Sequence, residues 1–574
     1  MAAAPIPLEA DGFYHPCSES EVIALIQFAR SNALHVRGRG ATHSVAWSIY
    51  TDPVDAHPPN RTLQQSPPPG EVNLAFDKMR DLEWVDAAGG VIEAGPGINL
   101  GWDPQDPFGV STLENSLLHQ IFEQGWAVDT LGGITHQTLA GFTATGSAGG
   151  STRHGWDNVI AFRIVDGLGN AEWIDRDHPH FDAMGTSMGL LGIVTRLRMQ
   201  LVPMYNITGT EIMTAIGGAD APMDFLGDGT AHPAQPSLGD FLKEQPYARV
   251  VWWPQKGAER IQTWQAERAL RNDRNLIPYQ QFTPDFGGQT EMLLASVVFM
   301  LAGNTNPLRI IGLIWQKIGI YLENLAFALR QSGSGSFSRF FTYLLGCVTG
   351  IIVWVLGLVL AFLSGLMRIA FPKLLPIFQP LTKPGAETHF HDYYWRSLCM
   401  DNTVSDGLLG TEFTEIWVPI QYTQRVMNLY QSMFEAGGNA ATGYFSTEVY
   451  GGPPTAGWMH PGYTDGSDEY KDGSVRIDVY WFRDNQGIPN LDEGFLDQYW
   501  EVLRDNGVPF RLHWGKFVPR YDFADWAAHY RANLPRFDDF MALREARDPD
   551  GLFFTDYWRL RLTGSTSIET VVSD

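Results

Sequence analysis

The spacing of apolar residues over the first 200 positions predicts alternating helices and strands. Between residues 18 and 33, apolar side chains recur at helical spacing after serines that can cap the first turn, which predicts a helix. A short apolar strand follows and leads into Gly38 and Gly40, where the backbone can approach a ligand closely. Alternating or glycine-bounded apolar runs predict further strands within 72–76, 89–98, 159–174 and 192–203.

The pattern changes near residue 205, where aromatic, strand-like segments begin to dominate. We predict strands within 248–264, 410–420, 443–451 and 474–483, and a late helix from residue 537 that ends at the Asp-Pro-Asp-Gly turn 548–551. Because 574 residues exceed what one core usually supports, two or more domains are expected, with a boundary at 204/205. The predicted fold class is α+β, with a large antiparallel sheet flanked by helices.

One long apolar run interrupts this second half. Residues 340–367 carry no charged side chain and are long enough to cross a bilayer, while 307–331 is apolar but contains Arg309, Lys317 and Glu323. A membrane hairpin, a helix lying in one leaflet and a buried helix of an enlarged domain are the alternatives. The cost of burying the charges disfavours the hairpin, so monotopic membrane contact is preferred, with the buried helix close behind.

Composition removes several classes of function. The formal net charge of −24 makes a nucleic-acid partner unfavourable. Three widely spaced cysteines predict neither a disulfide framework nor a metal site. The first 16 residues lack the basic and apolar regions of a signal peptide, so we expect an intracellular protein, either cytoplasmic or peripheral to a membrane.

Three segments carry candidate chemistry. The first is the loop Val36–Ser44, whose Gly38 and Gly40 let backbone N–H groups approach a pyrophosphate, although a simple tight turn explains it too. The second is the Gly-, Ser- and Thr-rich stretch Thr130–Val159, which suits a dinucleotide or else a flexible polar loop. In the third, Phe510–Phe517, Lys516 could stabilise negative charge on a cofactor or substrate, or could be a lone surface lysine.

Taken together, the order and wording of these motifs resemble the aldonolactone and alditol oxidases of the vanillyl-alcohol-oxidase superfamily, whose FAD-binding domain is of the PCMH type. The resemblance covers about 13–203 and 405–565. It implies an FAD domain at 1–204, a substrate (cap) domain at 205–505 with an apolar helical insertion at about 292–380, and a C-terminal segment 506–574 that returns to the FAD domain.

In the family, the histidine of the first loop carries FAD covalently, and His43 stands at that position. The implied cofactor-binding residues are Arg37, Gly38, Arg39, Gly40, Ala41, Thr42, His43, Ser44, Gly132, Gly133, Thr138, Gly141, Thr145, Gly146, Ser147, Ala148, Ile193 and His513. Lys516 would face the substrate, and no metal is implied.

The predicted sheet adds two substrate-facing pairs. Glu415 and Trp417 align with a Glu-x-Arg pair that contacts substrate in alditol oxidase, and Glu448 with Tyr450 forms a second pair; each glutamate could instead face solvent. Three polar groups of the family are missing: the arginine replaced by Trp417, a serine replaced by Gly133, and a histidine after the Ala-Thr-Gly motif. These losses suggest a less hydrophilic substrate.

The resemblance implies oxidation of a CH–OH group in an alcohol or lactone. Hydride would pass to FAD, a base would take the hydroxyl proton, and oxygen would be reduced to hydrogen peroxide. Glu415, Glu448 and His513 remain open as the base. Two alternatives stay: a membrane-associated oxidase or dehydrogenase of a lipophilic alcohol such as a sterol or terpenoid, and a non-catalytic flavin-fold binding protein.

Overall fold

The computed structural model describes residues 4–51, 67, 70–230, 235–255, 259–279, 355, 387–400, 411–442, 446–482 and 491–565. The apolar insertion predicted at about 292–380 lies outside these ranges, apart from Val355. Among the residues described, no helix has both the length and the apolar character needed to cross a bilayer.

The chain opens with a helix and a pair of parallel strands, as predicted. Helix α1 (Glu19–Asn32) begins at Ser18, whose side chain accepts a hydrogen bond from the Glu21 N–H, and its apolar face is fully buried. Strand β1 (Val36–Arg39) pairs in parallel with β2 (Val72–Ala75). The short helix α2 (Ala46–Ile49) follows β1, so the loop 40–45 is held between two defined elements.

An antiparallel sheet of five strands completes the N-terminal region. Its order is β3-β4-β8-β6-β7. The strands are β3 (Leu82–Asp86), β4 (Val91–Ala94), β6 (Val159–Val165), β7 (Ala171–Asp175) and β8 (Ile193–Gln200). The small pair β5 (Trp126–Ala127) and β9 (Val202–Pro203) closes this region. The strands predicted at 159–174 and 192–203 are therefore confirmed.

A second, eight-stranded sheet follows in the order β13-β10-β12-β11-β15-β16-β14-β17, and every pairing in it is antiparallel. Its strands are β10 (Tyr205–Ala215), β11 (Tyr247–Trp253), β12 (Arg260–Leu270), β13 (Glu387–Tyr393), β14 (Thr411–Pro419), β15 (Thr447–Gly452), β16 (Ser474–Phe482) and β17 (Arg511–Leu512). The segment 248–264, predicted as one strand, forms two, because Pro254 lacks an N–H for the ladder and ends β11.

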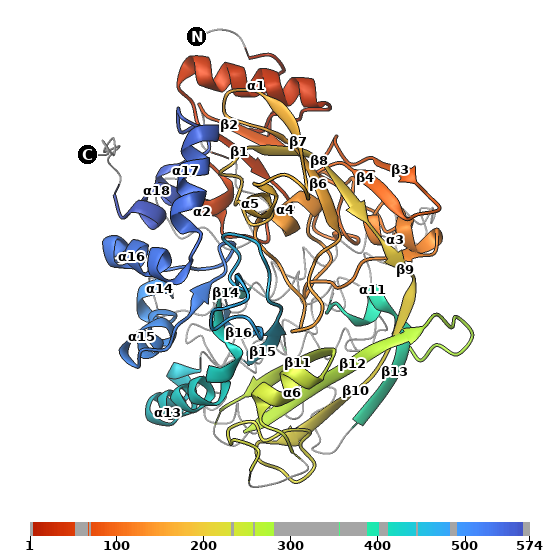
Figure 1. The fold of residues 1–574 in the computed structure, drawn as a ribbon, viewed down its shortest axis with the longest axis vertical. Coiled ribbons are helices and arrows are strands. Elements are labelled where there is room, and N and C mark those ends of the chain that lie inside the picture. Colours follow the sequence, from red (N-terminus) through yellow and green to blue (C-terminus); the bar gives the residue numbers. More distant parts are fainter. Residues whose placement is uncertain are drawn as a thin grey trace.

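Short helices surround the two sheets, and the remaining ones lie near the C-terminus. Figure 1 shows the later helices along one flank of both sheets. The helices not yet given are α3 (Leu117–Glu123), α4 (Leu139–Ala144), α5 (Phe181–Met184), α6 (Leu238–Glu244), α11 (Tyr394–Ser397), η1 (Ile420–Tyr422), α13 (Thr423–Ala441), α14 (Leu491–Gly494), α15 (Asp497–Asp505), α16 (Phe523–Asn533), α17 (Phe537–Arg547) and α18 (Asp556–Thr563). The α+β class and the large antiparallel sheet are confirmed.

The C-terminal segment packs back on the N-terminal region (Figure 1). The Val36 N–H donates to the Leu552 carbonyl at 2.8 Å, and Arg37 donates from Nη1 to the Phe553 carbonyl at 3.3 Å. Both contacts bring the tail against β1, so residues more than 500 positions apart form one unit around the loop 40–45.

The turn after α17 depends on one buried carboxylate. Asp548 is fully buried and accepts hydrogen bonds from the N–H groups of Leu552 (2.8 Å) and Phe553 (2.9 Å). Burial raises the pKa of this carboxyl above its ordinary value, and the two N–H donors oppose that shift. Asp548 thus shapes the same turn that supplies carbonyls to Val36 and Arg37.

We expect Asp548→Ala to lower the free energy of unfolding by about 1–3 kcal/mol, because two buried N–H groups lose their acceptor. Asp550→Ala is the matched control: its half-exposed surface pair with Arg30 contributes about 0–1 kcal/mol. Urea unfolding of the three proteins measures the difference, and equal losses in both variants would contradict this role.

Candidate active site

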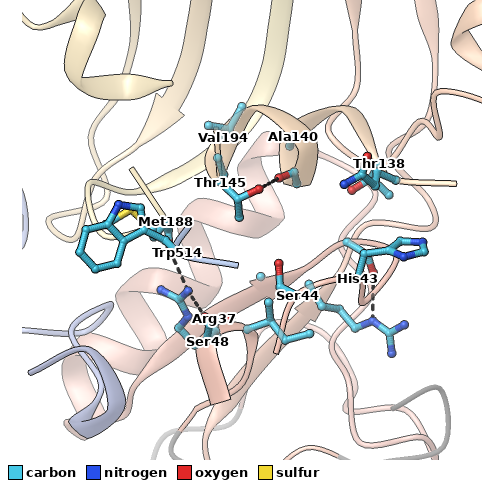
Figure 2. Close-up of a pocket in the computed structure, with 18 of the residues that line it drawn as sticks. Arg37, His43, Ser44, Ser48, Thr138, Ala140, Thr145, Met188, Val194 and Trp514 are labelled. Carbon is cyan, nitrogen blue, oxygen red and sulfur yellow. Dashed lines mark hydrogen bonds between the residues drawn. The ribbon is translucent and has the colours of Figure 1, made fainter. Parts of the chain in front are cut away.

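A large cavity lies between the loop after β1 and helix α4. Its volume, with open solvent included, is about 1050 Å³. Figure 2 shows Thr138, Ala140 and Thr145 on one side and His43 and Ser44 on the other. Fifteen of the predicted residues line it: Arg37, Gly38, Arg39, Gly40, Ala41, Thr42, His43, Ser44, Thr138, Gly141, Thr145, Ser147, Ile193, His513 and Lys516.

The loop 40–45 is shaped by close backbone approach. A Cβ at Gly40 would lie 2.3 Å from the Thr138 hydroxyl oxygen, so only glycine lets this loop reach the start of α4. Thr42 adopts a left-handed conformation with φ of 58°, which is strained for a threonine. These two features turn the segment around His43 toward the cavity wall.

Arg37 and Arg39 are both buried but make different contacts. The Arg37 guanidinium donates to the carbonyls of Ser48 and Met188 as well as Phe553, so it mainly ties β1 to its surroundings. Arg39 lies over the Phe13 ring at 5.2 Å and donates from Nε to the Gly40 carbonyl. Its Nη2 has no hydrogen-bond partner among the described residues.

Other lining groups are also unsatisfied. The Thr42 hydroxyl and the Gln137 side-chain carbonyl are buried and make no hydrogen bond within the described part of the chain. Together with Arg39 Nη2, they place two donors and an acceptor on the wall of one cavity. Because buried polar groups are costly when unpaired, this wall fits a polar ligand with several hydrogen-bonding groups.

The C-terminal motif reaches the same cavity. The Val45 N–H donates to the Gly515 carbonyl at 2.9 Å, and Lys516 Nζ donates to the His43 carbonyl at 3.3 Å. A Cβ at Gly515 would lie 2.8 Å from the Ser44 hydroxyl oxygen. The loop of His43 and the segment 513–516 are therefore one structural unit, although 473 positions separate Lys516 from His43.

His513 is neutral and has a defined tautomer. Burial, with help from Lys516 and Arg476, lowers its pKa to about 4 against the opposing charge of Glu415. Its Nδ1 accepts a hydrogen bond from the Gly515 N–H at 3.1 Å, so the proton of the neutral ring sits on Nε2. His513 can thus donate a hydrogen bond from Nε2, which makes it a poor candidate for the base.

A smaller cavity, about 310 Å³, lies between the glycine-rich stretch and the eight-stranded sheet. Gly132, Gly133 and Tyr450 line it, as do Arg249 and Arg476, which the sequence reasoning missed. A Cβ at Gly150 would lie 2.4 Å from the Ala248 carbonyl oxygen, so glycine is needed where this stretch lies against β11. Gly146 and Ala148 line neither cavity, but the Ala148 carbonyl accepts from Arg476 Nη1 at 2.7 Å.

Strand register explains how these side chains meet. Arg249, Tyr450, Arg476 and Trp417 stand opposite one another on β11, β15, β16 and β14, in one row across the sheet. A second row on the same face is formed by Glu448, Asp478 and Glu415, each of which lies two residues along its strand from a member of the first row. Arg476 Nε lies 3.6 Å from Glu415 Oε1 and 3.5 Å from Asp478 Oδ1.

The register also shows what surrounds Trp417, the residue that replaces the family's arginine. The Trp417 indole N–H donates to Glu415 at 2.8 Å, and a guanidinium lies near Glu415 from Arg476 on the neighbouring strand. Alternating Arg476 and Asp478 in an otherwise apolar strand were the signal that could have revealed this guanidinium. The less hydrophilic substrate inferred from Trp417 stays a prediction.

The buried carboxyl groups differ in charge state. Burial raises the pKa of Glu415, but the cationic groups around it, with Arg476 in contact, outweigh burial, and the net shift is downward. For Glu448 and Asp478 burial dominates, and the pKa of each is raised. Both Tyr450 and Tyr480 donate to one Glu448 oxygen. Of the three carboxyl groups, Glu415 is therefore the one whose pKa is lowered, so its surroundings favour the ionised form.

Lys516 shares this environment. Burial lowers the pKa of its ammonium, while Glu415 and Asp478 raise it, and the net shift is downward. Its Nζ also lies 4.1 Å from the centre of the Phe413 ring. Glu415 itself lines neither cavity, but it lies 3.6 Å from Arg476, which lines the small one, and its charge acts on Lys516 and His513, which line the large one.

Comparisons with known proteins show which proteins this chain resembles in sequence. No protein-family model matches the chain. D-arabinono-1,4-lactone oxidase from Eremothecium gossypii is 27% identical over 208 residues, 35% of this chain and 33% of that protein. The Saccharomyces cerevisiae protein of that name is 34% identical over 16% of this chain and 19% of its own length. L-gulonolactone oxidase from Mus musculus is 22% identical over 42% of this chain and 45% of its own length. The matches thus span between a fifth and half of these relatives.

Solved structures match over nearly the whole chain. Cholesterol oxidase from B. sterolicum has a TM-score of 0.60 with 15% identity, covering 96% of this chain and 93% of that one. A second structure, a solvent-stable cholesterol oxidase, has a TM-score of 0.53 with 14% identity over 95% and 93%. The resemblance predicted from the motifs is therefore confirmed: the chain is similar in sequence to the aldonolactone oxidases and has the fold of the cholesterol oxidase structures.

Proposed function

We propose that this protein is an FAD-dependent oxidoreductase that oxidises a CH–OH group of a small alcohol or lactone. The observation that carries the proposal is the joining of the His43 loop, the start of α4 and the segment 513–516 around one large cavity. The names of the similar proteins, lactone oxidases and cholesterol oxidase, support the same reaction class.

The large cavity suits FAD on the evidence of its own walls. The close approach at Gly40 and the unsatisfied groups of Arg39, Thr42 and Gln137 fit a long polar cofactor. His43 lines the cavity, where it would carry the covalent bond to the flavin. When bound, FAD supplies the hydride acceptor. Oxygen as the final acceptor is supported by the relatives' names as oxidases.

The residues of this chain provide the base, the positive charge and the hydrogen bonds for the reaction. Glu415, whose ionised form is favoured beside Arg476, takes the proton from the substrate hydroxyl. Lys516 offers positive charge at the wall of the large cavity, and His513 offers a hydrogen bond from Nε2. Trp417 and Arg476 hold Glu415 in place. Gly132, in the glycine-rich stretch, lines the small cavity.

The covalent bond is tested by acid precipitation of the purified protein. We expect a yellow pellet from the wild type and a colourless pellet with yellow supernatant from His43→Ala, since the substitution removes the attachment atom. Absorbance at 450 nm of both fractions is the readout. A protein purified with FAD present that is colourless in both fractions would contradict the proposed function itself.

Lys516→Met should lower turnover by about a hundredfold, the typical cost of removing one preorganised electrostatic group. Hydrogen peroxide release with D-arabinono-1,4-lactone and an alditol panel measures it. The control is Lys471→Met, an exposed lysine in the loop before β16. Unchanged turnover in Lys516→Met with intact FAD binding would rule out the assigned role.

The pH profile distinguishes Glu415 from Glu448 as base. A base must be ionised, and the pKa of Glu415 lies below the ordinary 4.5 while that of Glu448 lies above it. We therefore expect kcat/KM to hold as pH falls from 7 toward 5, with its acidic limb below 4.5. Glu415→Gln should cost about a hundredfold or more in kcat and Glu448→Gln less. An acidic limb above 4.5 that Glu448→Gln abolishes would assign the base to Glu448 instead.

A further inference from the structure

The segment 457–463, between β15 and β16, is bound to the C-terminal wall of the large cavity. The Met459 carbonyl accepts a hydrogen bond from the Trp514 indole N–H at 2.8 Å, and Trp514 lines that cavity. Arg511 donates from Nη1 to the Tyr463 carbonyl at 2.6 Å. The segment therefore keeps a fixed position relative to the C-terminal motif, although it lines neither of the two cavities.

Within this segment, the His460 ring has a defined tautomer and two backbone partners. Its Nδ1 accepts a hydrogen bond from the Gly462 N–H at 2.9 Å, so the neutral ring carries its proton on Nε2. The ring also donates to the backbone of Gly146 at the end of α4. Burial lowers the pKa of His460 to about 3, and the charge of His513 acts in the same direction. The ring is therefore neutral at physiological pH, and each nitrogen keeps one role.

Gly146 forms a turn that joins two residues of the cavity wall. Thr145 and Ser147, on either side of it, line the large cavity. Gly146 has a φ of 73°, in the left-handed region that favours glycine, and a Cβ there would lie 2.6 Å from His460 Cδ2. Glycine at this position lets the ring lie against the turn, so His460 connects the α4 wall with the segment 457–463.

The same ring packs on Trp417 in an edge-to-face arrangement. The ring centres are 5.3 Å apart and the planes meet at 84°, which is a favoured geometry for aromatic pairs. Trp417 is fully buried, and its indole N–H donates to Glu415 at 2.8 Å. A Cβ at Gly462 would lie 3.2 Å from both His460 Nδ1 and Trp417 Cζ3, so the three residues are in close contact. Loss of the His460 ring would leave a space into which the indole could shift, and its N–H would then move relative to Glu415.

We propose that His460 is a positioning residue for the oxidation. It fixes the cofactor wall at Gly146 relative to Trp417, and Trp417 in turn keeps the Glu415 carboxylate in place. The inference rests on the proposed function, which assigns FAD to this wall and the proton transfer to Glu415. A histidine combines the three contacts, because one nitrogen accepts a hydrogen bond, the other donates one and the ring packs on the indole.

His460→Asn in the FAD-loaded full chain tests both contacts. Asparagine keeps an acceptor for the Gly462 N–H but is too short to reach Gly146, and it has no ring to pack on Trp417. We expect the visible absorption bands of the bound flavin to shift and kcat to fall about tenfold, since small displacements of reacting groups are costly. The acidic limb of kcat/KM should move to higher pH, because the Trp417 hydrogen bond lowers the pKa of Glu415 and its weakening raises that pKa.

His460→Gln separates the two contacts. Its amide can donate to Gly146 but it lacks the ring, so we expect wild-type flavin bands with the acidic limb still at higher pH. Trp417→Phe removes the indole N–H that binds Glu415. Adding His460→Asn to Trp417→Phe should move the limb no further, because residues that act through one contact are not additive.

The matched control is His529→Asn, in α16. His529 is also a partly buried histidine that donates from Nε2 to a carbonyl, that of Phe510 at 3.2 Å, and accepts at Nδ1 from Asn533 at 3.4 Å. It lines neither cavity. We expect this variant to lower the midpoint of thermal unfolding as His460→Asn does, with the flavin bands, kcat and acidic limb of the wild type.

Unchanged flavin bands or an unchanged acidic limb in His460→Asn would overturn the role of His460, as would a further shift of the limb when it is added to Trp417→Phe. Thermal unfolding shows whether each variant is folded. If the asparagine variant is not, the acidic limb of the glutamine variant still tests the Trp417 contact. A wild type that holds FAD but oxidises none of the lactone and alditol panel would contradict the proposed function, while the flavin bands still test the Gly146 contact. Wild-type turnover, with bands and limb that no His460 substitution alters, would contradict only this inference.

Discussion

The contact between the loop of His43 and the segment 513–516 is what the site depends on. One backbone hydrogen bond, from Val45 to Gly515, and one from the Lys516 ammonium to the His43 carbonyl join segments from opposite ends of the chain. A Cβ at Gly515 would lie 2.8 Å from the Ser44 hydroxyl oxygen, so glycine lets the Ser44 side chain lie against this segment. Without this junction, Lys516 and His513 would not line the cavity that the first loop forms.

The C-terminal helices pack against the outer side of that junction and stabilise it. Arg37 binds the Ser48, Met188 and Phe553 carbonyls, and Asp548 orders the turn that presents Phe553. The loop of His43 is therefore braced on its outer side by buried charge-assisted hydrogen bonds, which are stronger than neutral ones. A cofactor that binds at such a wall meets a surface that is already ordered, so little conformational entropy is lost on binding.

The eight-stranded sheet imposes a second constraint, because it gathers charges in a dry interior. Three carboxyl groups and two arginines share one face, and each must be neutralised by a proton, a partner or a ligand. Arg476 Nε lies within 3.6 Å of Glu415 and Asp478, and Tyr450 and Tyr480 donate to Glu448. Arg249 donates to the Leu398 carbonyl and lies over the Trp264 ring, with Tyr279 beside it.

Local sequence patterns determined many structural features of this protein. The helical spacing after Ser18 and the alternating strands predicted the elements and the α+β class, because each depends on neighbouring residues. The motifs, among them the glycines around His43 and the segment 513–516, predicted fifteen residues of the large cavity's wall through their resemblance to the aldonolactone and alditol oxidases. Only the tertiary structure decided which charges meet. Arg249, Tyr450, Arg476 and Trp417 come from four strands, and their alignment depends on register between segments up to 227 positions apart, counting from Arg249 to Arg476. The pairing of Arg476 with Glu415 follows from that register. No local pattern encodes it, since a shift of one residue would turn either side chain to the other face of the sheet.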